Sequence, residues 1–116
     1  MIGLDRLMKR SGVIAAGQFT DDGKVARAVG DLAPEKMEKL AQLCAKTHAS
    51  MSQNAKAVGD ATGFGFHPME GWALTGGNVA LLVVGNTGVL VDSIKADFSQ
   101  IWVDLYGPPA AGKAVP

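Results

Sequence analysis

The chain has 116 residues, 47% of them hydrophobic, and its 11 basic residues balance 11 acidic ones. This length predicts one domain with a single core, and the apolar fraction excludes a wholly disordered chain. With no net charge to attract phosphate groups, the sequence predicts no nucleic-acid partner and favours self-association. One cysteine, Cys44, excludes an internal disulfide, and no apolar run reaches the ~20 residues of a membrane-spanning helix. We therefore expect a cytoplasmic protein without an integral membrane segment.

The N-terminal part predicts a short helix followed by a hairpin. Apolar residues recur at helical spacing over residues 4–8, and Gly12 lies where that helix must already have ended. Strands are predicted over residues 13–19 and 24–29, joined by a turn in which Gly23 can take the positive φ of a tight hairpin. The first strand is apolar at both odd and even positions, which predicts that both of its faces are covered.

A long helix is predicted from Pro34 to about Val58, with Gly59 as its C-terminal stop. Eight residues recur at i, i+3, i+4 spacing and are expected to face the core: Met37, Leu40, Ala41, Cys44, His48, Met51, Ala55 and Val58. Beside them lies a second stripe, of small residues: Ala45, Ala49 and Ser52. Such short side chains allow another backbone to come close.

Three more strands are predicted over residues 71–75, 78–85 and 88–94, separated by glycine-containing turns. The middle strand is apolar on both faces, which places it inside a sheet. A last helix follows over residues 95–107 and presents one apolar face: Phe98, Ile101, Trp102 and Leu105. The order of elements predicts an α+β fold, α-β-β-α-β-β-β-α, with a five-stranded antiparallel sheet and helices on both faces. The domain is expected to span residues 1–106, with a mobile tail over residues 107–116.

Two motifs suggest chemistry that the rest of the sequence does not support. Residues 107–114 match the G-x-x-x-x-G-K spacing of a phosphate-binding loop, but Ala114 replaces the required Ser or Thr, and the motif follows a helix instead of a strand. Cys44, His48 and His67 are too few ligands for a zinc site. Burial within a helix raises the pKa of a thiol, so we do not expect Cys44 to act as a nucleophile. We therefore expect no catalytic residues, no metal and no cofactor.

Three other features have structural explanations. The glycines between residues 59 and 71 follow a helix and precede a strand, the reverse of a dinucleotide-binding motif. Asp21 and Asp22 are adjacent turn formers, not a carboxylate pair in a pocket. Trp72, near Phe64 and Phe66 in sequence, could form a ligand platform, cover the core or meet a partner, and we favour the latter two.

The stretch GVIAAGQFTDDGKVARAVGDL over residues 12–32 resembles the Roadblock/dynein-light-chain family, in its Gly-Val helix end and its Asp-Gly turn. The later hairpin NVALLVVGNTGVLVDSI and the closing helix also resemble that family, so the likeness covers residues 1–106 and suggests an uncharacterised prokaryotic branch. The resemblance implies a profilin-like sandwich that forms a homodimer, in which the long helices pack antiparallel and the third strands meet. It assigns the interface to Ala45, Ala49 and Ser52 and to residues 69–75, among them Met69, Gly71, Trp72, Ala73, Leu74 and Thr75.

By this resemblance the protein is a non-enzymatic adaptor or scaffold, either a regulator of a small Ras-like GTPase or a subunit of a larger complex. One alternative is a small-molecule sensor with a pocket between sheet and helix. Another is an accessory protein of a sulfur-oxidising, heterodisulfide-reductase-like system. An enzyme using Cys44 or a histidine would reveal itself by fast thiol alkylation, and we expect slow alkylation instead.

Overall fold

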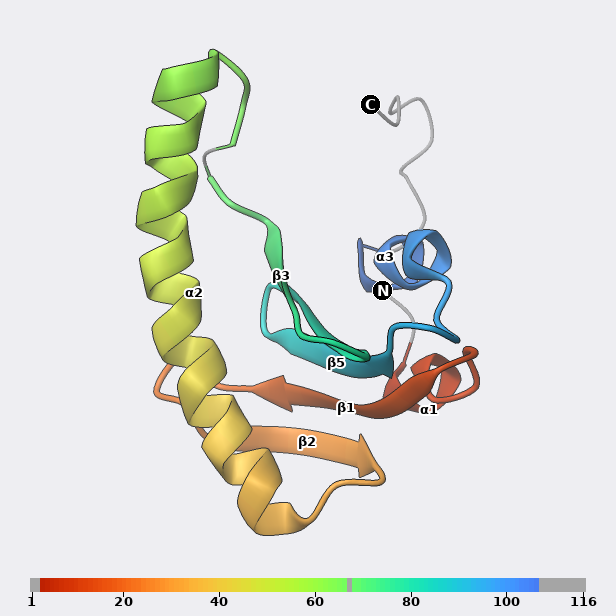
Figure 1. Ribbon diagram of the computed structural model, residues 1–116. Helices are drawn as coiled ribbons and strands as arrows, with labels where there is room; N and C mark the ends of the chain where they lie inside the picture. The colour runs from red at the N-terminus through yellow and green to blue at the C-terminus, as the bar shows by residue number, and fades with distance from the viewer. Residues whose placement is uncertain (1–2, 67, 107–116) are drawn as a thin grey trace.

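The computed structural model describes residues 3–66 and 68–106. The eight elements are, in chain order, α1 (Leu4–Leu7), β1 (Val13–Phe19), β2 (Val25–Gly30), α2 (Pro34–Thr62), β3 (Gly71–Thr75), β4 (Val79–Val84), β5 (Thr87–Asp92) and α3 (Phe98–Tyr106). The strands form one antiparallel sheet in the order β2-β1-β5-β4-β3 (Figure 1). The predicted fold class and order of elements are confirmed. The tail predicted over residues 107–116 lies outside the described residues.

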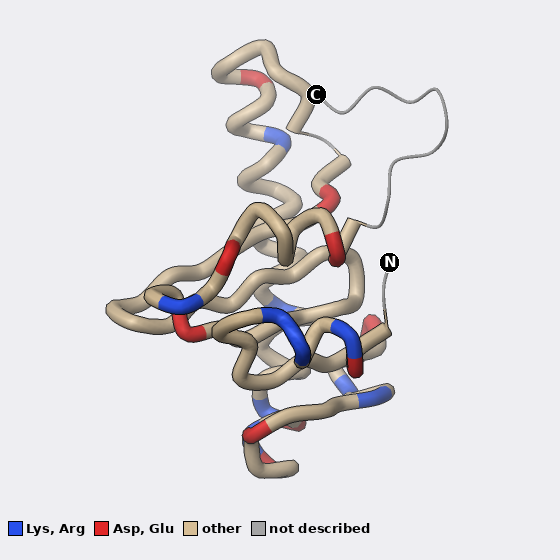
Figure 2. The backbone as a smooth tube through the Cα atoms, turned by 90° about the vertical axis from the view of Figure 1, so that its right-hand side faces the viewer, with Lys and Arg blue, Asp and Glu red and all other residues tan. Residues whose placement is uncertain are grey.

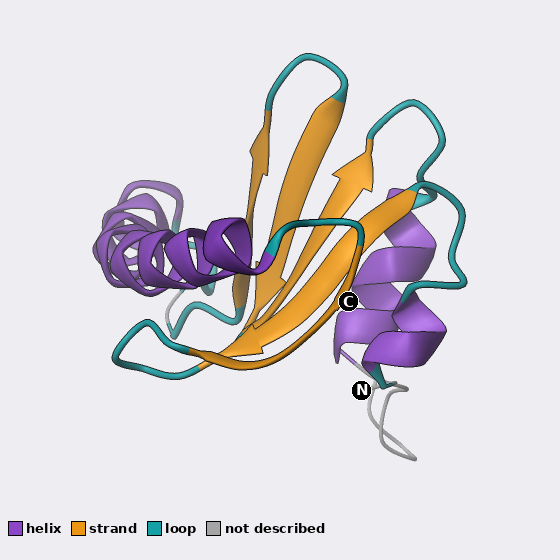
Figure 3. Ribbon diagram, turned by 90° about the horizontal axis from the view of Figure 1, so that it is seen from below, coloured by secondary structure: helices purple, strands orange, loops and turns teal. Residues whose placement is uncertain are grey.

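Helices cover both faces of the sheet, with α2 on one side and α1 and α3 on the other (Figure 3). Strand β4 shows how the sequence produces this sandwich: Ala80 and Leu82 belong to the apolar cluster under α1 and α3, while Leu81 and Val83 belong to the one under α2. Strand β1 is also covered on both sides, because neighbouring Ala15 and Ala16 are both buried. The two-sided apolar patterns of these strands are therefore explained by their central places in the sheet.

The hairpin between β1 and β2 turns at Gly23, whose φ is +81°. An added Cβ there would lie 3.1 Å from Cα of Gln42 in α2, so the turn needs glycine both for its backbone conformation and for its close approach to the helix. The turn also bonds to itself, because the Lys24 N–H donates to Thr20 Oγ1 at 3.0 Å. The predicted hairpin is confirmed.

Helix α2 ends later than predicted. It continues through Gly59 to Thr62, and Gly63, with a φ of +75°, donates its N–H to the Gly59 carbonyl at 2.8 Å. Gly63 supplies the left-handed conformation that ends a helix, whereas Gly59 stays helical at a cost of up to about 1 kcal/mol relative to alanine. The core stripe was also predicted too long, because Val58 is exposed while Ala41, Cys44 and Ala55 are buried.

Helix α3 begins at Phe98, three residues later than predicted. The Asp97 carboxylate accepts the N–H of Gln100 at 3.1 Å and so caps the first turn. Ile101 and Leu105 are buried and Phe98 and Trp102 half-buried, as the predicted apolar face requires.

A buried carboxylate on α3 was not predicted. Asp104 is almost completely buried and accepts both Nε and Nη2 of Arg10, the latter at 2.9 Å, while Gln100 Nε2 donates to it at 3.1 Å. The two hydrogen bonds from Arg10 hold the pKa of Asp104 below its usual value. They tie the segment after α1 to the last helix across 94 positions of sequence.

Candidate functional site

Strand β3 is an edge of the sheet, since among the described residues it pairs with β4 alone. Ala73, Leu74 and Thr75 are exposed, Gly71 is half-buried, and Met69 just before the strand packs against the cluster under α2. Along an edge strand the outward N–H and C=O groups form a template for pairing with another strand. The predicted strand interface therefore lies on an accessible edge.

The side chain of Trp72 belongs to the core, although its backbone lies on this edge. The indole is buried in the cluster under α2, and its Nε1–H donates to Nδ1 of His48 at 3.3 Å. This contact joins β3 to the middle of α2. Phe64 and Phe66, by contrast, are exposed beyond the C-terminal end of α2.

Helix α2 is longer than the sheet is wide. Its 29 residues extend about 44 Å at 1.5 Å per residue, while five strands spaced ~4.8 Å apart span about 19 Å. In Figure 1 the helix crosses the sheet from β2 to β3, and its C-terminal half continues beyond β3. That half therefore projects past the open edge of the sheet.

The small-residue stripe lies on one flank of α2. Ala45 is half-buried and close to the β1–β2 turn, since an added Cβ on Gly23 would be 3.7 Å from its Cβ. Ala49 is exposed and Ser52 is half-buried. The structure thus gives Ala45 a neighbour within the same chain and leaves Ala49 the most accessible of the three.

The opposite flank of α2 carries larger apolar residues that sequence reasoning missed. At about 100° per residue, Leu43 and Val58 lie across the helix from Ala49. Two more exposed residues, Leu74 and Val79, lie on the same side of the sheet as α2. Leu74 pairs with Leu81, whose side chain packs under α2. Val79 lies two residues before Leu81 in β4, and side chains two residues apart on a strand point to the same face. The exposed fractions of Leu43, Val58, Leu74 and Val79 are 57%, 42%, 64% and 45%.

We call these four residues the apolar flank: Leu43 and Val58 lie on α2, and Leu74 and Val79 lie at one end of the sheet. Ala45 of the small-residue stripe lies beside the β1–β2 turn. Strand β3 begins at that same end of the sheet, because the Phe19 N–H at the end of β1 donates to the Asn86 carbonyl in the β4–β5 turn, and Gly71 at the start of β3 pairs with Val84 just before that turn. Leu74 and Val79 lie toward the other end, beside the β3–β4 turn. These four residues do not recur at a regular spacing in the sequence. The sequence feature that could have pointed to them is the expected position of β3 at the edge of the sheet.

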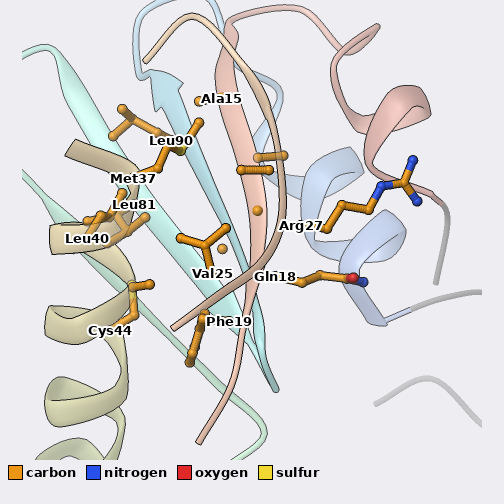
Figure 4. A pocket seen from close by; sticks show the side chains of 15 residues that line it. Ala15, Gln18, Phe19, Val25, Arg27, Met37, Leu40, Cys44, Leu81 and Leu90 are labelled. Atoms are coloured by element: carbon orange, nitrogen blue, oxygen red, sulfur yellow. The ribbon is translucent and has the colours of Figure 1, made fainter. Parts of the chain in front are cut away.

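A small hollow of about 40 Å³ separates the N-terminal half of α2 from the sheet (Figure 4). We call it the α2 hollow. Met37, Leu40, Ala41 and Cys44 lie on its helix side, and Ala15, Gly17, Gly88 and Leu90 on its sheet side. Burial raises the pKa of the Cys44 thiol to about 11, which keeps the thiol protonated and unreactive at neutral pH.

The remaining chemical candidates are not brought together. Within residues 3–66 and 68–106, no group of three or more His, Cys, Asp or Glu side chains could hold a metal ion. Asp21 and Asp22 are exposed turn residues, and a hydrogen bond from Thr20 lowers the pKa of Asp22. His67 and the glycine-rich residues 107–114 lie outside the described part of the chain.

Charges of both signs are interspersed on the side that carries α1 and α3 (Figure 2). Such a surface produces no strong field of one sign. In the described residues no helix is long and apolar enough to cross a membrane.

A family model described as Uncharacterized conserved protein (DUF2173) matches residues 3–106. A search of curated proteins found no match. Among solved structures, the fold is similar to MglB of Myxococcus xanthus, with a TM-score of 0.71 and 19% identity over 89% of this chain and 82% of that one. It is also similar to a Roadblock/LC7 domain of Streptomyces avermitilis, with a TM-score of 0.67 and 18% identity over 89% and 85%. A third similar structure is the gliding protein MglB of Thermus thermophilus, with a TM-score of 0.69 and 19% identity over 86% and 75%.

Proposed function

Because the chain belongs to the DUF2173 family and has the Roadblock/LC7 fold, we propose that it is a non-enzymatic adaptor that works as a homodimer joined along β3. The observation that carries this proposal is the projection of α2 past the open edge of the sheet. Within residues 3–66 and 68–106, no strand lies beneath about half of this long helix, although residues 64–66 return beside it at Gly59. A second copy, paired edge to edge, supplies that sheet and caps both open edges at once.

In the proposed dimer, residues 71–75 pair with the same residues of the partner around a twofold axis, and Met69 lies at the border of the joint. Each α2 then runs above the partner's sheet, antiparallel to the partner's α2. The sheet becomes continuous across both copies. The buried Trp72 indole and its hydrogen bond to His48 connect β3 to α2, so the strand and helix surfaces of the proposed joint are linked within each chain.

Two flanks of α2 could form the helix contact. The stripe of Ala45, Ala49 and Ser52 allows close approach and stays the prediction made from sequence. We place the contact on the apolar flank instead, since a twofold axis through the middle of β3 puts the partner helix on the Leu74 side of α2. Burial of this flank removes exposed apolar surface, which favours association.

Sedimentation velocity of two charge variants decides between the flanks. Val58→Glu should dissociate the dimer, because it places two carboxylates in the joint, whereas Ala49→Glu should leave it intact. If Ala49→Glu dissociates and Val58→Glu stays dimeric, the helix contact lies on the small-residue stripe and the homodimer proposal still stands. A wild-type chain that is monomeric at micromolar concentration would refute the homodimer itself.

The physiological partner is a further part of the proposal. The Roadblock resemblance supports a small Ras-like GTPase or a multi-subunit complex as the protein that the dimer binds, with a sulfur-oxidising, heterodisulfide-reductase-like system as the alternative. Crosslinking in native cells followed by affinity capture on the wild-type dimer and on Val58→Glu identifies the protein. A true adaptor partner should be recovered with the dimer and depleted with the monomeric variant.

A further inference from the structure

Four residues on the sheet side of the α2 hollow have little or no side chain: Ala15, Gly17, Ala28 and Gly88. Larger apolar residues complete the lining on that side: Phe19, Val25, Leu81 and Leu90. The antiparallel register places Gly17 of β1 opposite Gly88 of β5, and Ala15 opposite Leu90. Ala28 of β2 lies beside Gly17 on the other side. Two central strands therefore present a depression to the helix above them.

The helix does not fill this depression. Met37 and Leu40 are only half-buried, and so are Gly17, Gly88 and Leu90, although β1 and β5 are inner strands covered by a helix. The hollow is thus open to solvent along one side. Its lining residues are mostly apolar, the neutral Cys44 thiol included, and Figure 4 shows the polar side chains of Gln18 and Arg27 pointing away from α2.

An apolar hollow of this kind offers water few hydrogen-bonding partners. Its volume of about 40 Å³ corresponds to about three water-sized spheres, or an alkyl segment of about three or four carbons. We propose that the α2 hollow binds the alkyl end of a small molecule whose polar end stays in solvent. The site lies over β1 and β5, under the N-terminal half of α2, and is separate from the β3 edge.

Titration with a series of 1-alkanols from ethanol to hexanol, followed by amide NMR shifts of the full chain, tests this proposal. Saturable shifts are expected at Gly17, Cys44 and Gly88. Each added methylene that enters the hollow should tighten binding about fourfold, and the gain should stop near butanol, where the hollow is full. Affinity that keeps rising through hexanol, or shifts without saturation, would overturn the proposal.

Gly88→Ala fills the hollow without strain. The added Cβ would lie 3.6 Å from Val83 Cγ2 and 3.8 Å from Leu81 Cδ1, both ordinary contacts. We expect this variant to fold, to resist thermal unfolding at least as well as the wild type, and to bind butanol at least tenfold more weakly. Undiminished butanol binding by folded Gly88→Ala would refute the site.

Two further variants control for effects of the substitution itself. Gly65→Ala adds the same methyl group where nothing lies within 4 Å, so its butanol affinity should equal that of the wild type. Cys44→Ala enlarges the hollow. The affinity of this variant for 1-alkanols should therefore keep increasing with chain length as far as pentanol, one carbon beyond the wild type. Sedimentation of the same samples keeps this result separate from the dimer proposal, since a monomer can still bind alkanols.

Discussion

Leu74→Lys should separate the proposed dimer without unfolding the chain. Full burial of a leucine contributes about 1.5–3 kcal/mol, and 64% of Leu74 is still exposed in one chain, so burial in a joint could add about 1–2 kcal/mol per copy. A twofold interface contains this residue twice, which gives about 2–4 kcal/mol and a dissociation constant about 30- to 1,000-fold weaker in the variant. The lysines also oppose strand pairing directly, because a charged side chain on an edge strand disfavours a neighbouring strand.

The assay is sedimentation velocity over a concentration series, with circular dichroism to establish that the variant is folded. Val103→Lys is the matched control: Val103 is 52% exposed, but it lies on α3, on the opposite face of the sheet. That control should associate as the wild type does. Equal dissociation constants for Leu74→Lys and the wild type would refute a joint along β3, whichever flank of α2 is involved.

Two predictions concern titratable groups. Because Arg10 lowers the pKa of Asp104, this pair stabilises the fold fully above the unfolded carboxyl pKa of about 3.9, and the stabilisation is lost as the pH falls through the lower folded pKa. Asp104→Asn should therefore unfold at a lower urea concentration than the wild type at pH 7. Its free energy of unfolding should also decrease less than that of the wild type as the pH is lowered into the acid range. An unchanged urea midpoint at pH 7 would contradict the role of the pair. Since burial raises the pKa of Cys44 to about 11, iodoacetamide at pH 7 should modify the folded chain far more slowly than the urea-unfolded chain, and equal rates measured by mass spectrometry would contradict this.

The sequence by itself determined the elements, their order and the turns between them. Helical spacing, two-sided apolar strands and a glycine at the hairpin turn can each be read within a short stretch of sequence, because the periodicity of buried positions differs between helices and strands. Gly23 needs a positive φ whatever the rest of the chain does, and β4 is apolar at every position because both of its faces are covered. The joint along residues 71–75 was implied by the family resemblance, because the order of elements does not decide whether β3 or β5 pairs with β1; the structure places β3 at the edge.

Only the tertiary structure decided what each surface faces. Val58 has the spacing of a core residue, yet it is exposed because α2 extends beyond the last strand. Asp104 has the pattern of a solvent residue, yet it is buried because the chain brings Arg10 to it from 94 positions away. The α2 hollow exists because strand order places β1 beside β5, so that two glycines distant in sequence lie opposite each other. Burial depends on which segments meet in space, and the pairing of distant segments leaves no local period in the sequence.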